Sequence, residues 1–174
     1  FQKLDLFSVT LRQIGAQIGR MLLEDAVDVI VNGDGNGNPA KVSSVAQAGK
    51  LTYEDLVAFW NDFEPYQLNA LLVGTDTLPK LLDLRQMRDP EAGLDFHGTG
   101  RMVTPMGAKV LRSSAVPAGK ILGLDKNYAL EMVCAGDVMV EYDKLIDRQV
   151  ERAAITSTSG FAKLYTDAGK LLTI

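Results

Sequence analysis

The sequence predicts an α+β fold, and three features of its hydrophobic pattern support this. A long amphipathic helix should occupy residues 4–31, a mixed segment of short helices and strands should follow, and strands should dominate from residue 108 onward. The chain has 174 residues, which is enough for one domain of ordinary size and marginal for two small ones.

Composition is that of a globular protein with a mildly acidic charge. Apolar residues make up 47% and charged residues 23%, which excludes wholesale disorder. No apolar run approaches the roughly 18 residues of a membrane span, so we expect a soluble protein with no membrane partner. The formal net charge of −4 is the wrong sign for a protein that binds nucleic acid by neutralising phosphates. The single cysteine, Cys134, excludes an internal disulfide and fits a reducing compartment.

The first predicted helix carries the strongest periodicity in the chain. Over residues 4–31 it would be about 40 Å long, which is long for a small globule. The glycine-rich residues 32–39 should end it, because Gly33 can adopt a left-handed cap and Pro39 prevents continuation. Steps of three and four place its apolar residues in one stripe, formed by Leu4, Phe7, Leu11, Ile14, Ile18 and Met21.

A second predicted helix begins at Thr52, which is a suitable N-cap residue, and stops before Pro65. We expect Trp60 to pack inside it with Leu56 and Phe63 as a core anchor, because spacings of three and four residues share a helix face. Further along, the pattern predicts a central strand at 68–73, a helix at 78–87 and an exposed loop or flap at 89–107.

The second half of the chain reads as short strands. Residues 109–112 and 120–124 each form one, with a turn containing Pro117 between them, and residues 129–133 form another. Val138, Val140 and Tyr142 alternate with more polar neighbours, which predicts a half-buried strand. The last stretch, 149–174, alternates again with Gly160 and Gly169 as breaks.

Residues 32–37 match the first half of an EF-hand calcium loop, in which alternating side-chain oxygens surround the ion. The second half fails, since Ser43 stands where the loop needs its bidentate glutamate. A glycine-rich helix terminus, in which Asp and Asn side chains bond their own backbone, explains the same residues. We therefore expect no micromolar binding of a divalent ion there.

No catalytic, cofactor or metal site emerges from the other motifs. Ala-Gly-Lys occurs at 48–50, 118–120 and 168–170, but no copy has the upstream glycine or the following Ser or Thr of a phosphate loop. His97 is the only histidine and should be a solvated loop residue, while Cys134 should be a small buried hydrophobe. One histidine and one cysteine also exclude a zinc site of ordinary composition.

The order of these elements resembles the major capsid proteins of tailed bacteriophages, which share the Hong Kong 97 fold. In that family a long spine helix ends in a similar Asn-Gly-Asp-Gly-x-Gly turn, as residues 22–38 do here. Further similarity lies in residues 96–116, in 119–125 leading to 138–142, and in the terminal stretch 149–174. The resemblance covers nearly the whole chain. It implies a Hong Kong 97-like capsid fold with a long spine helix, a peripheral-type strand region and an axial-type α/β domain.

The resemblance also implies a domain division and a function. Residues 1–31 and 137–174 would form a peripheral domain, and residues 32–136 an axial domain whose loops meet at capsomer centres. The protein would be a structural capsid protein and not an enzyme, self-assembling as pentamers and hexamers into an icosahedral head. Its other partners would be scaffold, protease and portal proteins, with packaged DNA contacted only non-specifically. It would be assembled in the bacterial cytoplasm and located in the virion.

Three alternatives remain open. An encapsulin-type compartment shell protein resembles the same fold but encloses enzymes in place of a genome. A small metal-dependent or hydrolytic α/β enzyme would use the loop around Asp34, although no second acidic ligand or placed base accompanies it. A plain interaction module would show a small, defined stoichiometry in solution.

The start of the chain differs from the family that it resembles. The chain begins at Phe1 and enters periodic sequence within three residues, whereas the family has an N-terminal arm and an extended loop before the spine helix. In that family both elements clasp neighbouring subunits. We therefore expect the 174-residue chain to fold but to remain monomeric or form small oligomers, and a longer product to form capsomers or closed shells.

Overall fold

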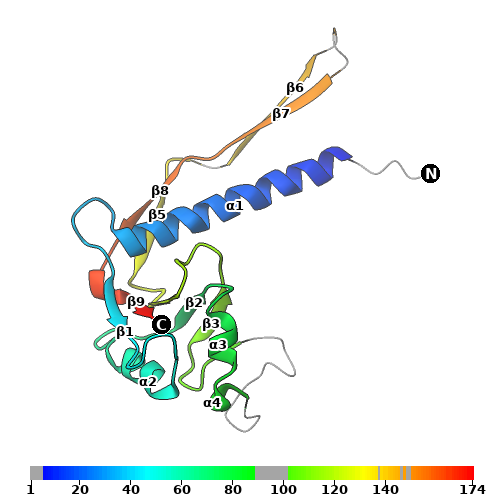
Figure 1. Cartoon of the computed structure of the whole chain (residues 1–174). Helices are drawn as coiled ribbons and strands as arrows, with labels where there is room; N and C mark the ends of the chain where they lie inside the picture. Colours follow the sequence, from blue (N-terminus) through cyan, green and yellow to red (C-terminus); the bar gives the residue numbers. More distant parts are fainter. Residues whose placement is uncertain (1–5, 89–101, 137, 146, 148–149) are drawn as a thin grey trace.

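The computed structural model describes residues 6–88, 102–136, 138–145, 147 and 150–174. It consists of a compact domain and a long arm that extends away from it (Figure 1). The compact domain holds a five-stranded sheet with short helices, and the arm combines the first helix with two-stranded ladders. This is the α+β architecture that the sequence predicts. Among the described residues, no helix is long and apolar enough to cross a membrane.

The five-stranded sheet has the strand order β1-β9-β4-β2-β3. Strand β4 runs antiparallel to both neighbours, whereas the outer pairs β1–β9 and β2–β3 are parallel. The sequence predicts β2, β3 and β4, but not β1, which has a single apolar residue, Val42. The strands are β1 (Lys41–Ser44), β2 (Ala70–Val73), β3 (Lys109–Arg112), β4 (Lys120–Leu124) and β9 (Gly169–Thr173).

Both faces of this sheet are buried, which explains the unbroken apolar run of β2. Leu71 and Val73 belong to the core cluster on the side of the short helices. Leu72, which points the other way, packs in a second cluster with Val27 and Ile30 from the end of the first helix. Because successive strand residues point to opposite faces, a strand covered on both sides has to be apolar at every position.

Helix α2 (Tyr53–Asn61) begins where the sequence predicts, at a capping box. The Asp55 amide donates to the Thr52 hydroxyl at 3.3 Å, and the Asp55 carboxylate accepts from the Thr52 amide at 2.9 Å. The two contacts satisfy backbone donors that a helix start otherwise leaves without partners. The helix ends at Asn61, before Pro65, as predicted.

The prediction that Trp60 packs inside α2 is wrong. Its side chain is 44% exposed, whereas Leu56, Phe59 and Phe63 are buried. These three residues are spaced by three and four positions and define the buried face. Trp60 follows Phe59 directly in sequence, so its side chain points to one side of that face. The rings of Phe59 and Phe63 meet edge to face with centroids 5.3 Å apart, so that pair is the aromatic anchor of the core.

The single helix predicted over 78–87 is two short helices, α3 (Leu78–Leu82) and α4 (Arg85–Arg88). Between them the Leu84 amide bonds the Leu81 carbonyl, a three-residue spacing that interrupts the α-helical pattern.

The flap predicted at 89–107 falls mostly outside the described residues, as does His97. In its described end, the Met102 carbonyl accepts the Val110 amide at 2.8 Å, so the segment lies against the outer edge of β3. That edge of the sheet is therefore partly covered by the chain itself.

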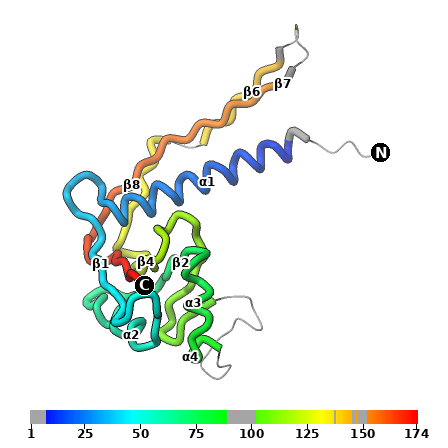
Figure 2. The backbone as a smooth tube through the Cα atoms, in the orientation of Figure 1, coloured from blue at the N-terminus to red at the C-terminus, as the bar shows by residue number. Residues whose placement is uncertain are grey.

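The arm begins with helix α1 (Leu6–Asn32), close to the predicted span of 4–31. It continues with two antiparallel ladders, and α1 and the β6–β7 ladder extend in the same direction away from the compact domain (Figures 1 and 2). A short 3-10 helix, Thr166–Ala168, leads from the arm back into β9. The paired strands are β5 (Leu130–Cys134) with β8 (Ser159–Lys163), and β6 (Met139–Leu145) with β7 (Val150–Thr156).

Two predictions for the arm are wrong. The strand containing Val138, Val140 and Tyr142 is not half-buried, since all three side chains are exposed. Cys134, expected to be a small buried hydrophobe, is also exposed. Tyr142 and Cys134 lie in ladders of only two strands, and although α1 contacts β8, the side chains of β5 from Glu131 to Cys134 stay exposed.

Candidate functional site

Chemistry-bearing side chains do not gather in the part of the chain that the structure describes. There, no group of three or more His, Cys, Asp or Glu side chains is placed to hold a metal ion. Glu24 and Asp25 are both exposed on a solvated face of α1. The features that stand out are exposed surfaces of the arm, the joint that fixes the arm to the compact domain, and a pocket beside α2.

The apolar stripe of α1 is fully buried only near its end, and Leu11, Ile18 and Leu22 are half-buried. Val27 and Ile30 are buried against the compact domain, whereas Ile14 is exposed and Met21 is 53% exposed. Val9 and Leu23 widen the exposed apolar surface. A helix that presents apolar side chains along most of its length is typical of a surface that another chain covers.

The ladders of the arm expose apolar side chains in the same way. Met139 and Val140, neighbours whose side chains point to opposite faces of β6, are both exposed. Tyr142 is 63% exposed, and Met132 and Val133 continue the exposed surface onto β5. An ion pair across the β6–β7 ladder, Asp143 with Arg152 at 2.7 Å, lies in solvent and stabilises it little. An isolated two-stranded ladder is marginally stable in water.

A buried lysine forms the joint between arm and compact domain. The ammonium of Lys163, at the end of β8, donates to the carbonyl of Ile30 at 2.9 Å and to the carbonyl of Asn38 at 2.8 Å. The first of these carbonyls belongs to the last turn of α1, where the helix leaves acceptors without partners. The second lies at the end of the glycine-rich turn. One side chain thus ties the helix end, the turn and β8 together.

The turn itself is held by hydrogen bonds to its own carboxylate. Asp34 accepts the backbone amides of Lys163 at 3.1 Å and of Asn36 at 3.2 Å. The bond from the Lys163 amide is the main cause that lowers the pKa of Asp34 below its usual value. Burial lowers the pKa of the Lys163 ammonium, and the nearby negative charge of Asp34 opposes that shift. These contacts support the helix-terminus interpretation of the turn, while the absence of calcium binding stays a prediction.

The sequence does not predict the role of Lys163, because no motif around it indicates that its side chain caps the end of a helix. It lies 125 residues from Asn38 in sequence, and its neighbours on β8 read as an ordinary alternating strand. Lys170 was missed for the same reason. It is 95% buried in β9, pairs with the Asp62 carboxylate at 3.0 Å, and lies 5.4 Å from the centre of the Phe63 ring.

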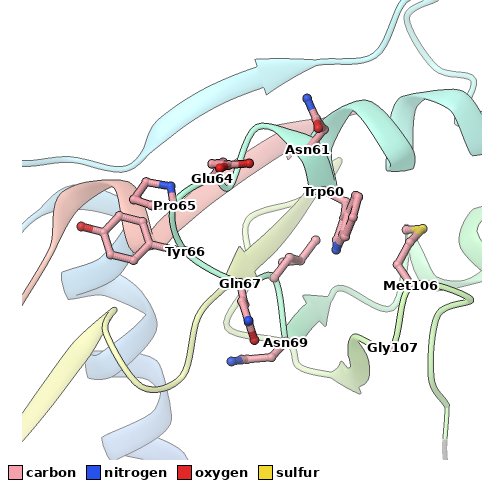
Figure 3. A pocket seen from close by; sticks show the side chains of 10 residues that line it. Trp60, Asn61, Glu64, Pro65, Tyr66, Gln67, Asn69, Met106 and Gly107 are labelled. Atoms are coloured by element: carbon pink, nitrogen blue, oxygen red, sulfur yellow. The ribbon is translucent and has the colours of Figure 1, made fainter.

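A pocket of about 460 Å³ opens beside the end of α2 (Figure 3). Trp60 and Met106 lie next to each other on one side, and Gln67 and Asn69 line the floor. The buried carboxylate of Asp125 holds this floor, since it accepts the Gln67 amide and the Asn69 side-chain amide, each at 2.9 Å. The described lining contains no histidine, cysteine or lysine, and its one carboxylate is that of Glu64.

Comparison with known proteins identifies the fold. The sequence matches no protein-family model and no curated protein. Among solved structures, the chain is similar to the capsid of an empty GTA particle, with a TM-score of 0.68, 17% identity, and coverage of 98% of this chain and 66% of that one. A chain of Mycobacterium phage Che8 gives a TM-score of 0.68 at 11% identity, with coverage of 98% and 63%.

The holo encapsulin complex of Synechococcus elongatus is also similar, with a TM-score of 0.65 and 14% identity over 99% of this chain and 66% of that one. The chain therefore spans just under two thirds of the length of these structures. The Hong Kong 97-like fold expected from the resemblance is confirmed, and the likeness covers both the compact domain and the arm.

Proposed function

We propose that this protein is the structural subunit of a capsid of the tailed-phage type, which self-assembles into a closed icosahedral shell around DNA. The observation that supports this most is the arm. Its helix and ladders expose apolar side chains on surfaces that no described part of the same chain covers. In a monomer these apolar side chains stay exposed to water, whereas a subunit surrounded by copies of itself would bury them. The capsid of a GTA particle has a similar fold, and the likeness covers the arm of this chain.

The proposal includes a division into two structural units. The expected boundaries are 1–31 with 137–174 against 32–136, and the strand pairing favours exchanging two strands between these units. Strand β5 pairs with β8 and so goes with the arm as the peripheral unit. Strand β9 pairs with β1 and β4 and so goes with the compact domain as the axial unit. Lys163 lies at the boundary between the two units.

The proposed partners follow from the same role. Copies of this chain in pentamers and hexamers are the main ones, and scaffold, protease and portal proteins would act during assembly in the bacterial cytoplasm. The net charge of −4 suits a virion wall to which packed DNA should not adhere. The proposed role is structural, and no catalytic role is proposed.

Electron microscopy of the purified product of the complete gene tests this function. We expect rings or closed shells of uniform diameter, whose contents are DNA when they are isolated from producing cells. Shells that contain a protein cargo and no DNA would instead support the encapsulin alternative, which the likeness to the Synechococcus complex favours as the second candidate. A product that sediments as a monomer at all concentrations would contradict both.

A further inference from the structure

The turn that follows α1 contains every Asn-Gly and Asp-Gly pair of the chain. The pairs occupy residues 32–33, 34–35 and 36–37, and they follow one another without a gap. Such pairs are prone to cyclisation, because glycine has no side chain to shield its amide nitrogen from the carboxamide or carboxyl group of the preceding residue. The three pairs lie in one turn, yet the fold holds each of them differently, and their contacts rank their reactivity.

The first pair is protected by the end of α1. Asn32 is the last residue of the helix, and the Gly33 amide donates to the carbonyl of Val29 at 3.0 Å. The side-chain amide of Asn32 is also engaged, since it donates to the Asp28 carboxylate. The Gly33 nitrogen would have to leave its hydrogen bond, and the last turn of α1 would have to open, before this nitrogen could attack the carboxamide. We therefore expect a slow reaction at Asn32.

The second pair is protected by its charge. A carboxylate anion is a poor electrophile, so an Asp-Gly pair cyclises through its protonated form. Hydrogen bonds from the backbone amides of Lys163 and Asn36 keep the pKa of Asp34 below its usual value, and the group is ionised at neutral pH. The reactive form of this pair is therefore rare under the conditions in which the protein is folded.

The third pair has neither protection. Asn36 and Gly37 are exposed, and no described residue accepts a hydrogen bond from the Gly37 amide. A Cβ placed on Gly37 would meet nothing within 4 Å, so the backbone there has open space around it. The carboxamide of Asn36 donates to the Asp34 carboxylate at 2.9 Å in an exposed hydrogen bond. Because such a bond contributes little net free energy in water, it does not hold the carboxamide away from the Gly37 nitrogen.

We infer that Asn36 is a site of spontaneous deamidation, and that the fold confines this reaction to Asn36 among the three pairs of the turn. In the first step the Gly37 amide nitrogen loses its proton to solvent base and forms a bond to Cγ of Asn36. The carboxamide nitrogen takes up a proton, its bond to Cγ breaks, and it leaves as ammonia. Water then opens the resulting succinimide ring at either carbonyl, which yields aspartate or isoaspartate at position 36. Water is the only co-reactant.

The reaction changes the joint between the arm and the compact domain. Asn36 donates its backbone and side-chain amides to the Asp34 carboxylate, which also accepts the Lys163 amide. The product has no side-chain amide to donate, and it carries a second negative charge two positions from Asp34. That like charge disfavours the ionised form of Asp34 and so weakens its bond to the Lys163 amide. Deamidation therefore loosens the attachment of β8 to the turn, slowly and irreversibly, and this holds whether or not the protein forms a shell.

Peptide mass spectrometry of the complete protein tests the site. We would incubate the folded protein in mildly alkaline buffer, sample it over several days, and locate the deamidated residue by fragmentation. Asn36 should react at least about tenfold faster than Asn32, whose glycine neighbour has to break a backbone hydrogen bond first. In guanidinium chloride, where α1 is unfolded, the two residues should react at similar rates. This control separates the effect of the fold from the effect of the shared Asn-Gly sequence.

Two outcomes would overturn the inference. One is an equal rate at Asn32 and Asn36 in the folded protein, and the other is a folded protein in which neither residue reacts although both react in guanidinium chloride. Asn36→Gln should remove most of the mass change in the turn, since the longer side chain cyclises far more slowly. The matched control, Asn32→Gln, should leave the rate at Asn36 unchanged. The shell function is tested separately, by electron microscopy, and none of these results decides it.

A pair of variants tests the effect on the joint. Asn36→Asp supplies one product of the reaction directly, whereas Asn36→Ser removes the carboxamide without adding a charge. Both should fold, because the altered side chain is exposed. The Lys163 amide should exchange with solvent about two- to fivefold faster in Asn36→Asp than in Asn36→Ser, as expected for one added charge near an exposed carboxylate. Equal exchange in the two variants would contradict the loosened joint.

Discussion

The compact domain and the arm use similar apolar residues but bury them very differently. Leu71 in β2 is completely buried between two layers, whereas Tyr142 in β6 is 63% exposed on a ladder with no second layer. The compact domain has the features of a unit that is stable alone, with a sheet covered on both faces. The arm has the secondary structure of such a unit without its core. Under the proposed shell function, folding alone completes the compact domain, whereas neighbouring copies would complete the arm.

The largest expected effect comes from the core of the compact domain. Phe59→Ala should lower the free energy of unfolding by about 3–5 kcal/mol, because it removes a fully buried ring that packs on Phe63. Trp60→Ala on the same helix is the matched control and should cost less than about 1 kcal/mol in the unassembled protein. Reversible urea unfolding measures both. Equal losses for the two variants would contradict the assignment of the buried face of α2.

The glycines of the two regions should respond in opposite directions. A Cβ at Gly123 would come within 2.6 Å of the Phe59 ring, so Gly123→Ala should destabilise the compact domain by about 1–3 kcal/mol. Gly15 in α1 has open space around it, and Gly15→Ala should stabilise the helix by up to about 1 kcal/mol. Thermal unfolding of each variant checks the sign. A higher unfolding temperature for Gly123→Ala would contradict the predicted clash between the new Cβ and the Phe59 ring.

The hydrogen bonds of Lys163 should contribute less to the free energy of unfolding than the core does, but their loss should affect both the compact domain and the arm. Lys163→Met keeps the length of the side chain and removes the donor to Ile30 and Asn38, and we expect a loss of about 1–2 kcal/mol. Amides in the last turn of α1 should also exchange faster with solvent. Lys126→Met, at an exposed lysine, is the control and should leave both quantities unchanged. Unaltered exchange at the end of α1 in Lys163→Met would contradict the capping role.

The smallest effect is a pH dependence at the turn. The pKa of Asp34 is lowered in the folded chain, so its contribution to stability is present above its usual value of 3.8 and is lost as the pH falls through the lower folded value. An NMR titration of the Asp34 carboxyl should therefore show a midpoint below 3.8. In Asp34→Asn, the stability below about pH 4 should change less with pH than in the original. A midpoint at or above the usual value would contradict the hydrogen bond from the Lys163 amide.

Local signals predicted most elements of the fold but not the contacts between them. The capping box at Thr52, the end of α1 near Gly33 and the buried strand β2 all depend on short-range patterns, and the structure confirms them. Trp60 was misplaced because spacing alone does not say which of two overlapping helix faces is buried. The lysine joint could not be predicted, since Lys163 meets residues more than 120 positions away. Cys134 and Tyr142 were wrongly expected to be buried or half-buried. An apolar strand has the same sequence pattern whether its side chains pack within the chain or are left for a neighbouring chain to cover.

Hydrogen exchange of the unaltered protein, before and after assembly, tests the central claim most directly. In the unassembled protein, the amides of β2, β4 and β9 should exchange only on global unfolding, while those of β6, β7 and the first half of α1 should exchange within seconds to minutes. After assembly, protection should rise in the arm and change little in the interior strands of the sheet. Equal protection of β6–β7 and β2 before assembly, with no gain afterwards, would contradict the account that neighbouring copies complete the arm.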